Sequence, residues 1–153
     1  MVKYNNGDNT QVLFFVNNQG KQTQVISTKG EIFNCQFSPL KPVIYCLITR
    51  QDKLLKNAEN LTLEAINFNN YQESYLLNLP YQWGMNLSLS PDGTALLFDR
   101  IIPKKTEANK QDLKTATGTS IDTAEIMFLS LEDDQKMVPQ KLPLAGYNPQ
   151  WLP

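Results

Sequence analysis

The chain resembles itself at long intervals. Residues 11–48 align without a gap on residues 63–100, and residues 61–80 align on residues 124–143. The two shifts are 52 and 63 positions. Self-similarity at such periods is typical of arrays of supersecondary units, in which each unit needs a neighbour to cover its apolar face. The repeats therefore constrain the architecture more than any single motif does, and an array is first of all a scaffold.

The segments within each repeat have the pattern of strands. Residues 12–16 are β-branched and aromatic, residues 17–20 form a polar turn, and residues 21–27 resume a half-apolar pattern, which predicts a hairpin. The next hairpin has arms 33–38 and 43–49, and its counterpart one repeat later has arms 87–89 and 95–102. No segment combines a sustained helical period with capping residues. These patterns predict an all-β fold.

One tetrapeptide, Ser90-Pro91-Asp92-Gly93, predicts a tight hairpin turn. Pro91 presets φ for the second turn position, Asp92 can bond to nearby backbone, and Gly93 can take the positive φ of a bulge. Each residue type therefore suits the position that it would occupy in the turn.

The preceding repeat lacks the second half of this motif. Its Ser38-Pro39 is followed by Leu40-Lys41. A non-glycine residue in the left-handed region costs roughly 1 kcal/mol. We therefore expect a different, looser turn after Pro39.

The segment 90–98, with an apolar residue before its serine and an apolar run after its glycine, resembles the repeat signature of TolB-like, or WD40-like (PD40), β-propellers. Residues 147–153 are similar to the Pro-x-Trp-Ser-Pro entry of the same motif, with Leu152 where the family usually has serine. The resemblance extends along nearly the whole chain through the repeat period. It implies blades that are four-stranded antiparallel sheets.

Divided into such blades, residues 1–153 form one partial propeller domain. We expect the chain to begin in a loop and to supply, in order, two strands of one blade (11–27), two full blades (33–79 and 86–142) and the first strand of another (147–153). A closed propeller typically has 4–8 blades, so this number cannot close a ring. We therefore expect either a segment of a longer protein or a dimer in which a second copy covers the open blade edges.

Composition and charge exclude several function classes. Lys and Arg number 14 against 15 Asp and Glu, which leaves no basic footprint for nucleic acid. No apolar stretch approaches the roughly 20 residues of a transmembrane helix. The chain has no histidine, which removes Ser-His and Cys-His catalysis and the commonest metal ligand. We expect no catalytic constellation, no metal site and no cofactor.

The two cysteines, Cys35 and Cys46, lie on the arms of one predicted hairpin, close to the register at which they would face each other. That geometry permits a cross-strand disulfide. Because cysteine is among the most frequently buried residue types, the favoured interpretation is two reduced cysteines packed in the sheet.

Acidic residues give weaker indications. Residues 132–134 (Glu-Asp-Asp) lie in a predicted turn and lack the alternating spacing of a calcium loop, so a solvated turn is the favoured interpretation. Asp99 and Arg100 end an apolar strand, where we expect exposed or paired edge charges.

One predicted loop, 103–123, is a candidate binding region. It is eleven residues longer than its counterpart in the preceding repeat, and it is polar and flexible in composition. In a propeller this loop shares a face with the connections between blades. The candidate binding face comprises Tyr81, Gln82, Trp83, Lys104, Lys105 and Tyr147. In the alternative interpretation the insertion is a disordered excursion, and Tyr81 and Trp83 fill the gap between blades.

The resemblance implies a non-catalytic scaffold for protein–protein interaction, with a protein of unknown identity as the partner. Two alternatives stay open: a substrate-gating or substrate-binding propeller portion of a larger hydrolase or lyase, and a small-ligand or glycan module in which Tyr81 and Trp83 stack on the ligand. The compartment is not derivable from the sequence, and the family favours a periplasmic or other extracytoplasmic location.

Overall fold

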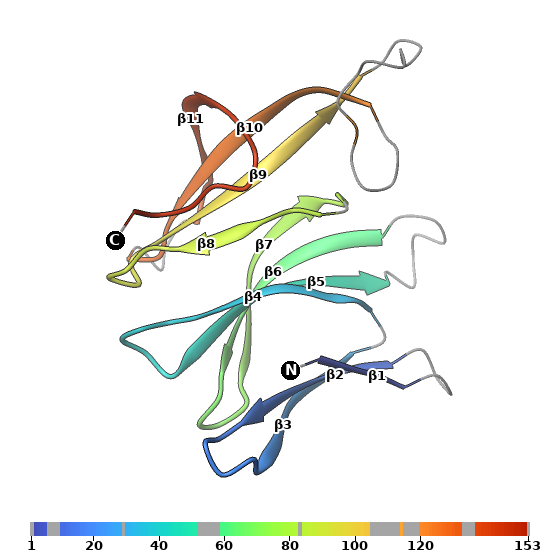
Figure 1. The fold of residues 1–153 in the computed structure, drawn as a ribbon, viewed down its shortest axis with the longest axis vertical. Coiled ribbons are helices and arrows are strands. Elements are labelled where there is room, and N and C mark those ends of the chain that lie inside the picture. The colour runs from blue at the N-terminus through green and yellow to red at the C-terminus, as the bar shows by residue number, and fades with distance from the viewer. Residues whose placement is uncertain are drawn as a thin grey trace. The chain divides into compact units, whose positions relative to one another are not determined.

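The computed structural model describes residues 2–5, 10–28, 30–51, 59–82, 84–104, 114, 120–132 and 137–152. Within these residues the chain has eleven strands, no helix and three antiparallel sheets (Figure 1), which confirms the predicted all-β class. The chain divides into two compact units, one of Met1–Ser38 with Pro42–Tyr81 and one of Pro39–Lys41 with Gln82–Pro153.

The first unit holds two sheets. The strands of the three-stranded sheet are β1 (Val2–Asn5), β2 (Thr10–Val16) and β3 (Gln22–Thr28), in the order β1-β2-β3. Those of the four-stranded sheet are β4 (Ile32–Phe37), β5 (Val43–Gln51), β6 (Glu59–Asn67) and β7 (Glu73–Pro80), in chain order. The prediction of a loop before residue 11 is wrong, because Val2–Asn5 pairs with Thr10–Leu13. Four residues are too few for an alternating pattern, so pairing with β2 defines this strand.

The hydrophobic core of the first unit lies between its two sheets. Leu13, Val25 and Ile26 from the three-stranded sheet pack against Ile44 and four further residues of the four-stranded sheet: Ile32, Cys46, Ile48 and Ile66. Each such aliphatic side chain contributes about 1.5–3 kcal/mol when fully buried. A polar link crosses the same boundary, since the backbone N–H of Ile32 donates to the side-chain oxygen of Gln11 at 2.7 Å.

Cys35 and Cys46 form a disulfide in this unit. They are direct partners across β4 and β5, with Cα atoms 4.2 Å apart, and Cys46 is fully buried. The register inferred from the sequence is confirmed, whereas the interpretation as two reduced cysteines is wrong. Burial alone does not distinguish a thiol from a disulfide. The decisive feature is the directly opposed cross-strand position, where antiparallel strands approach most closely.

Gly30 allows a close approach between the start of β4 and the end of β5. The backbone N–H of Glu31 donates to Oγ1 of Thr49 at 2.6 Å, and the N–H of Thr49 donates to the carbonyl of Glu31 at 2.8 Å. A Cβ atom at Gly30 would lie 1.5 Å from the backbone oxygen of Thr49. Only glycine fits there without moving the strands.

The second unit holds one four-stranded sheet. Its strands are β8 (Leu87–Leu89), β9 (Ala95–Pro103), β10 (Ile121–Ser130) and β11 (Gln140–Ala145), in the order β11-β10-β9-β8. The last strand extends beyond the predicted limit at residue 142. The sequence also predicts a strand at 147–153, but residues 147–152 are not in a strand. Trp151 instead donates from Nε1 to the carbonyl of Ser88 at 3.0 Å, so this segment is tied to β8.

The turn between β8 and β9 has the predicted form. Gly93 has φ of 69°, and its N–H donates to the carbonyl of Ser90 at 2.8 Å. The Asp92 carboxylate accepts hydrogen bonds from the Ser90 hydroxyl at 2.6 Å and from Oγ1 of Thr94 at 2.8 Å. The Ser90 hydroxyl bond, followed by those from Thr94, lowers the pKa of Asp92. These side-chain hydrogen bonds therefore stabilise the turn independently of the pairing between β8 and β9.

The turn between β4 and β5 differs, as expected. Neither Leu40 nor Lys41 has a positive φ. The N–H of Ser38 donates to the carbonyl of Val43 at 2.9 Å, which matches the bond from Ser90 to Ala95 in the other turn. The β4–β5 turn thus retains the hydrogen bond that closes the β8–β9 turn, although it has neither the left-handed glycine nor the aspartate.

Candidate functional site

The residues of the candidate binding face are distributed over both units. Tyr81, which is 39% exposed, belongs to the first unit, whereas Gln82, Lys104 and Tyr147 belong to the second. Trp83, Lys105 and most of the loop 103–123 lie outside the described residues. The proposed face therefore stays a prediction.

Within the second unit, two of these residues have defined backbone partners. The side-chain oxygen of Gln82 accepts a hydrogen bond from the N–H of Ile101 at 2.6 Å, and the N–H of Lys104 donates to the carbonyl of Ser120 at 2.9 Å. Both contacts lie at the same end of the β9–β10 pair. Two buried atoms near this end, Nε2 of Gln82 and Oγ of Ser120, have no hydrogen-bond partner.

Asp99 is fully buried on β9, so the expectation of an edge charge is wrong for this residue. One carboxylate oxygen accepts from the backbone N–H of Asn86 at 2.8 Å. The other accepts from Nδ2 of Asn86 at 3.1 Å and from the backbone N–H of Asn148 at 2.8 Å. The carboxylate therefore ties the chain entering β8 to the chain that follows β11.

This contact also positions Tyr147. Asn148 is one of two described non-glycine residues with positive φ, at 55°, and its N–H is held by Asp99. The neighbouring Tyr147 side chain is 63% exposed. An uncommon backbone conformation anchored to a buried carboxylate thus presents an aromatic side chain to solvent.

Arg100 is paired, as expected for an edge charge. Its Nε donates to Oε2 of Glu125 at 2.9 Å, and Lys141 donates from Nζ to Oε1 of the same carboxylate at 2.7 Å. The three residues connect β9, β10 and β11. The hydrogen bond from Lys141, followed by that from Arg100, lowers the pKa of Glu125. This arrangement braces the sheet across its strands.

Three aromatic residues of the first unit, whose contact the sequence did not predict, lie close together and are partly exposed. We call Phe15, Phe37 and Phe68 the phenylalanine cluster. The rings of Phe15 and Phe68 are stacked, with centroids 5.9 Å apart, and the Phe37 ring lies edge-on at 6.2 and 6.3 Å from them. Phe15 is 38% exposed and Phe37 is 55% exposed.

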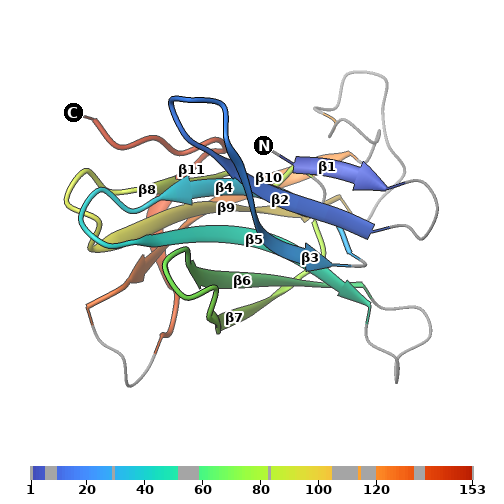
Figure 2. The same ribbon diagram turned by 90° about the horizontal axis from the view of Figure 1, so that it is seen from below.

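The cluster forms because β2, β4 and β6 end close together in the first unit. Phe15 is at the end of β2, Phe37 ends β4, and Phe68 follows β6. The C-terminal ends of β2, β4 and β6 lie at the same end of this unit in Figure 2. The sequence shows a phenylalanine close to the turn that follows each of these strands, but it does not show which of these residues contact one another in the folded chain.

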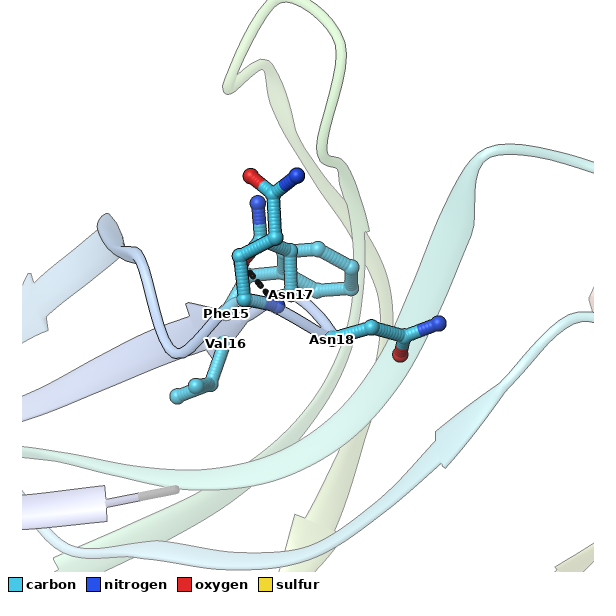
Figure 3. A pocket seen from close by; sticks show the side chains of 5 residues that line it. Phe15, Val16, Asn17 and Asn18 are labelled. Carbon is cyan, nitrogen blue, oxygen red and sulfur yellow. Dashed lines mark hydrogen bonds between the residues drawn. The ribbon is translucent and has the colours of Figure 1, made fainter.

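An open pocket of about 420 Å³ adjoins the cluster. It is lined by Phe15, Val16, Asn17, Asn18 and Gln19, all from the end of β2 and the following turn (Figure 3). The lining joins an aromatic ring to three side-chain amides, and none of the five side chains carries a charge. The pocket and the phenylalanine cluster together form the candidate functional site.

Among the described residues there is no group of three or more Cys, Asp or Glu placed to hold a metal ion. The same part of the chain has no helix that could cross a bilayer. Comparison with protein-family models, with curated proteins and with solved structures gave no match.

Proposed function

We propose that the chain is a segment of a β-propeller that acts as a non-catalytic scaffold and binds a protein partner. Three features support the blade assignment: the internal repeat, the Ser-Pro-Asp-Gly turn before β9, and two four-stranded antiparallel sheets whose strands follow chain order. Repetition of such sheets yields extended surfaces formed by turns, and these surfaces suit binding better than chemistry.

The exposed phenylalanine cluster is the observation that carries the proposal. Burial of apolar area stabilises a complex by about 25 cal/mol per Å², and aromatic residues are enriched at the centres of protein interfaces. Phe37 has more than half of its surface open to solvent, while its ring is held by two others. A ring that is already ordered loses little conformational entropy when a partner covers it.

The disulfide supports an oxidising compartment for this scaffold. Such bonds persist in secreted and periplasmic proteins and are rare where thiols are kept reduced. The Cys35–Cys46 bond therefore favours the extracytoplasmic location that the family resemblance implies.

Site-specific photo-crosslinking tests the proposal in the native host. A photoreactive phenylalanine analogue is placed at position 37 and, as a matched control, at position 75, because Tyr75 is equally exposed at 60% but lies outside the cluster. We expect a discrete cross-linked protein from position 37 and none from position 75. Equal cross-linking from both positions, or from neither, would contradict a docking role for the cluster.

Affinity measurements between the chain and the partner identified by cross-linking then quantify how much the Phe37 ring contributes to binding. Phe37→Ser is expected to weaken binding at least tenfold, whereas Tyr75→Ser leaves it unchanged. A third photoreactive position, 147, probes the face predicted from the sequence. Cross-linking from position 147 alone would place the binding surface at Tyr147 and not at the cluster. A cross-linked band of twice the chain mass would identify a second copy of the chain as the partner.

A further inference from the structure

The turn beneath the pocket has a fixed geometry. Oδ1 of Asn17 accepts hydrogen bonds from the backbone N–H of Gln19 at 3.0 Å and of Lys21 at 2.9 Å. The N–H of Gly20 donates to the carbonyl of Asn17 at 2.9 Å, and Gly20 has φ of 77°. Because these bonds hold the turn without a ligand, binding there needs little further ordering of the backbone.

The Phe15 ring provides a flat, fixed platform at the pocket. Phe68 is stacked on it, with an angle of 11° between the ring planes. Phe37 is almost equally far from both rings, so it lies beside the stacked pair and covers neither outer face. The face of Phe15 turned away from Phe68 is therefore covered by neither ring, in agreement with its 38% exposure.

Two side-chain amides at the pocket are available to a ligand. Asn18 and Gln19 are exposed, and among the described residues neither of their side-chain amides takes part in a hydrogen bond. Each amide offers two N–H donors and one carbonyl acceptor. Figure 3 shows the Asn18 side chain extending outward from the turn.

We propose that this pocket binds a neutral oligosaccharide built of hexose units. A pyranose ring presents an apolar face of C–H groups, which packs on an aromatic ring, and hydroxyl groups at its rim, which both donate to and accept from amides. The uncharged lining matches an uncharged ligand. The volume of about 420 Å³ lies in the range of small-ligand pockets.

The proposal does not rest on protein binding by the scaffold. Phe37 belongs to the phenylalanine cluster but does not line the pocket, and Asn18 and Gln19 line the pocket but are not part of the cluster. Changes at these positions therefore affect the two activities separately.

Nuclear magnetic resonance titration of the isotope-labelled full chain tests the proposal. The probes are four neutral hexasaccharides: maltohexaose, cellohexaose, laminarihexaose and N-acetylchitohexaose. At least one is expected to give saturable shifts in the amide signals of residues 15–21 and in the side-chain amides of Asn18 and Gln19. Because the pocket is open, the expected dissociation constant is about 1 mM.

Two variants assign the binding to the proposed groups. Phe15→Leu keeps an apolar side chain but removes the flat ring, and we expect it to weaken binding about tenfold. Tyr75→Leu, at an exposed aromatic residue outside both the pocket and the cluster, is its control and should leave binding unchanged. The double variant Asn18→Ala/Gln19→Ala should weaken binding to a similar extent as Phe15→Leu, whereas Asn78→Ala, an exposed amide on β7, should not.

Three results would overturn the proposal. One is the absence of saturable shifts with all four saccharides while the spectrum stays that of the folded chain. Another is binding that persists unchanged in Phe15→Leu and in the double variant. The third is binding of an uncharged, terminally blocked hexapeptide to residues 15–21 in place of the saccharides, which would assign the pocket to a protein ligand.

Discussion

The backbone N–H of Asn148 donates a 2.8 Å hydrogen bond to the carboxylate of Asp99, although 49 residues separate them in the sequence. Asp99 is fully buried, and each of its oxygens has at least one N–H donor. A buried carboxylate is tolerated because these donors replace water. The left-handed backbone of Asn148 is thereby fixed beside Tyr147.

Asp99→Asn should destabilise the chain. The variant keeps the shape of the side chain, but its NH₂ group must face a backbone or side-chain donor at one of the two oxygen positions. We expect a loss of about 3 kcal/mol in the free energy of unfolding, measured by urea denaturation. Asp122→Asn, at an exposed position on β10, is the control. A change at Asp99 within about 0.5 kcal/mol of the control would show that the carboxylate is dispensable.

Loss of the disulfide should destabilise the first unit. The bond closes a short loop, since the cysteines are 11 residues apart, and a loop of this length is expected to contribute about 3 kcal/mol. The double variant Cys35→Ala/Cys46→Ala should therefore unfold at lower urea concentration than the wild type. Under a reducing agent the wild type should approach the stability of the variant. Equal stability without reductant would contradict the prediction.

Gly93→Ala should cost about 1 kcal/mol of stability, because its φ of 69° places a Cβ atom in the disfavoured left-handed region. Gly146→Ala provides a matched comparison. A Cβ atom there would meet only Ile126 at an ordinary 3.8 Å, and alanine restricts the unfolded chain, so we expect no loss. Thermal unfolding of both variants measures the difference, and equal losses would show that the turn does not depend on glycine.

The Glu125 carboxylate should make stability depend on pH in the acidic range. Its pKa in the folded chain is lowered by Lys141 and Arg100, below the ordinary value of 4.5. The stabilisation is therefore fully present above pH 4.5 and is lost as the pH falls through the lower, folded-state pKa. Glu125→Gln should be less stable than the wild type at neutral pH, and the gap should close on acidification.

Urea unfolding of Glu125→Gln at neutral and at acidic pH measures this gap. Glu132→Gln, at an exposed position after β10, is the control and should show no such convergence with the wild type. A gap between Glu125→Gln and the wild type that does not vary with pH would contradict a role for the ion pairs.

Local features of the fold were predictable because they depend on neighbouring residues. The β8–β9 turn follows from the residue types of its four positions, and the pairing of Cys35 with Cys46 follows from counting outward from a turn. The short strand β1 was not predictable, because its four residues acquire a strand conformation only by pairing with β2.

The sequence by itself determined the all-β class, the repeat and the turn chemistry, since strand alternation and turn preferences act over a few residues. Only the tertiary structure decided that Asp99 is buried, that the cysteines are bonded, and that Phe15, Phe37 and Phe68 meet at an exposed end of the first unit. The physical reason is that burial and side-chain contact depend on how separate strands and turns pack. Residues distant in the chain must come together before a carboxylate loses its water or an aromatic surface forms.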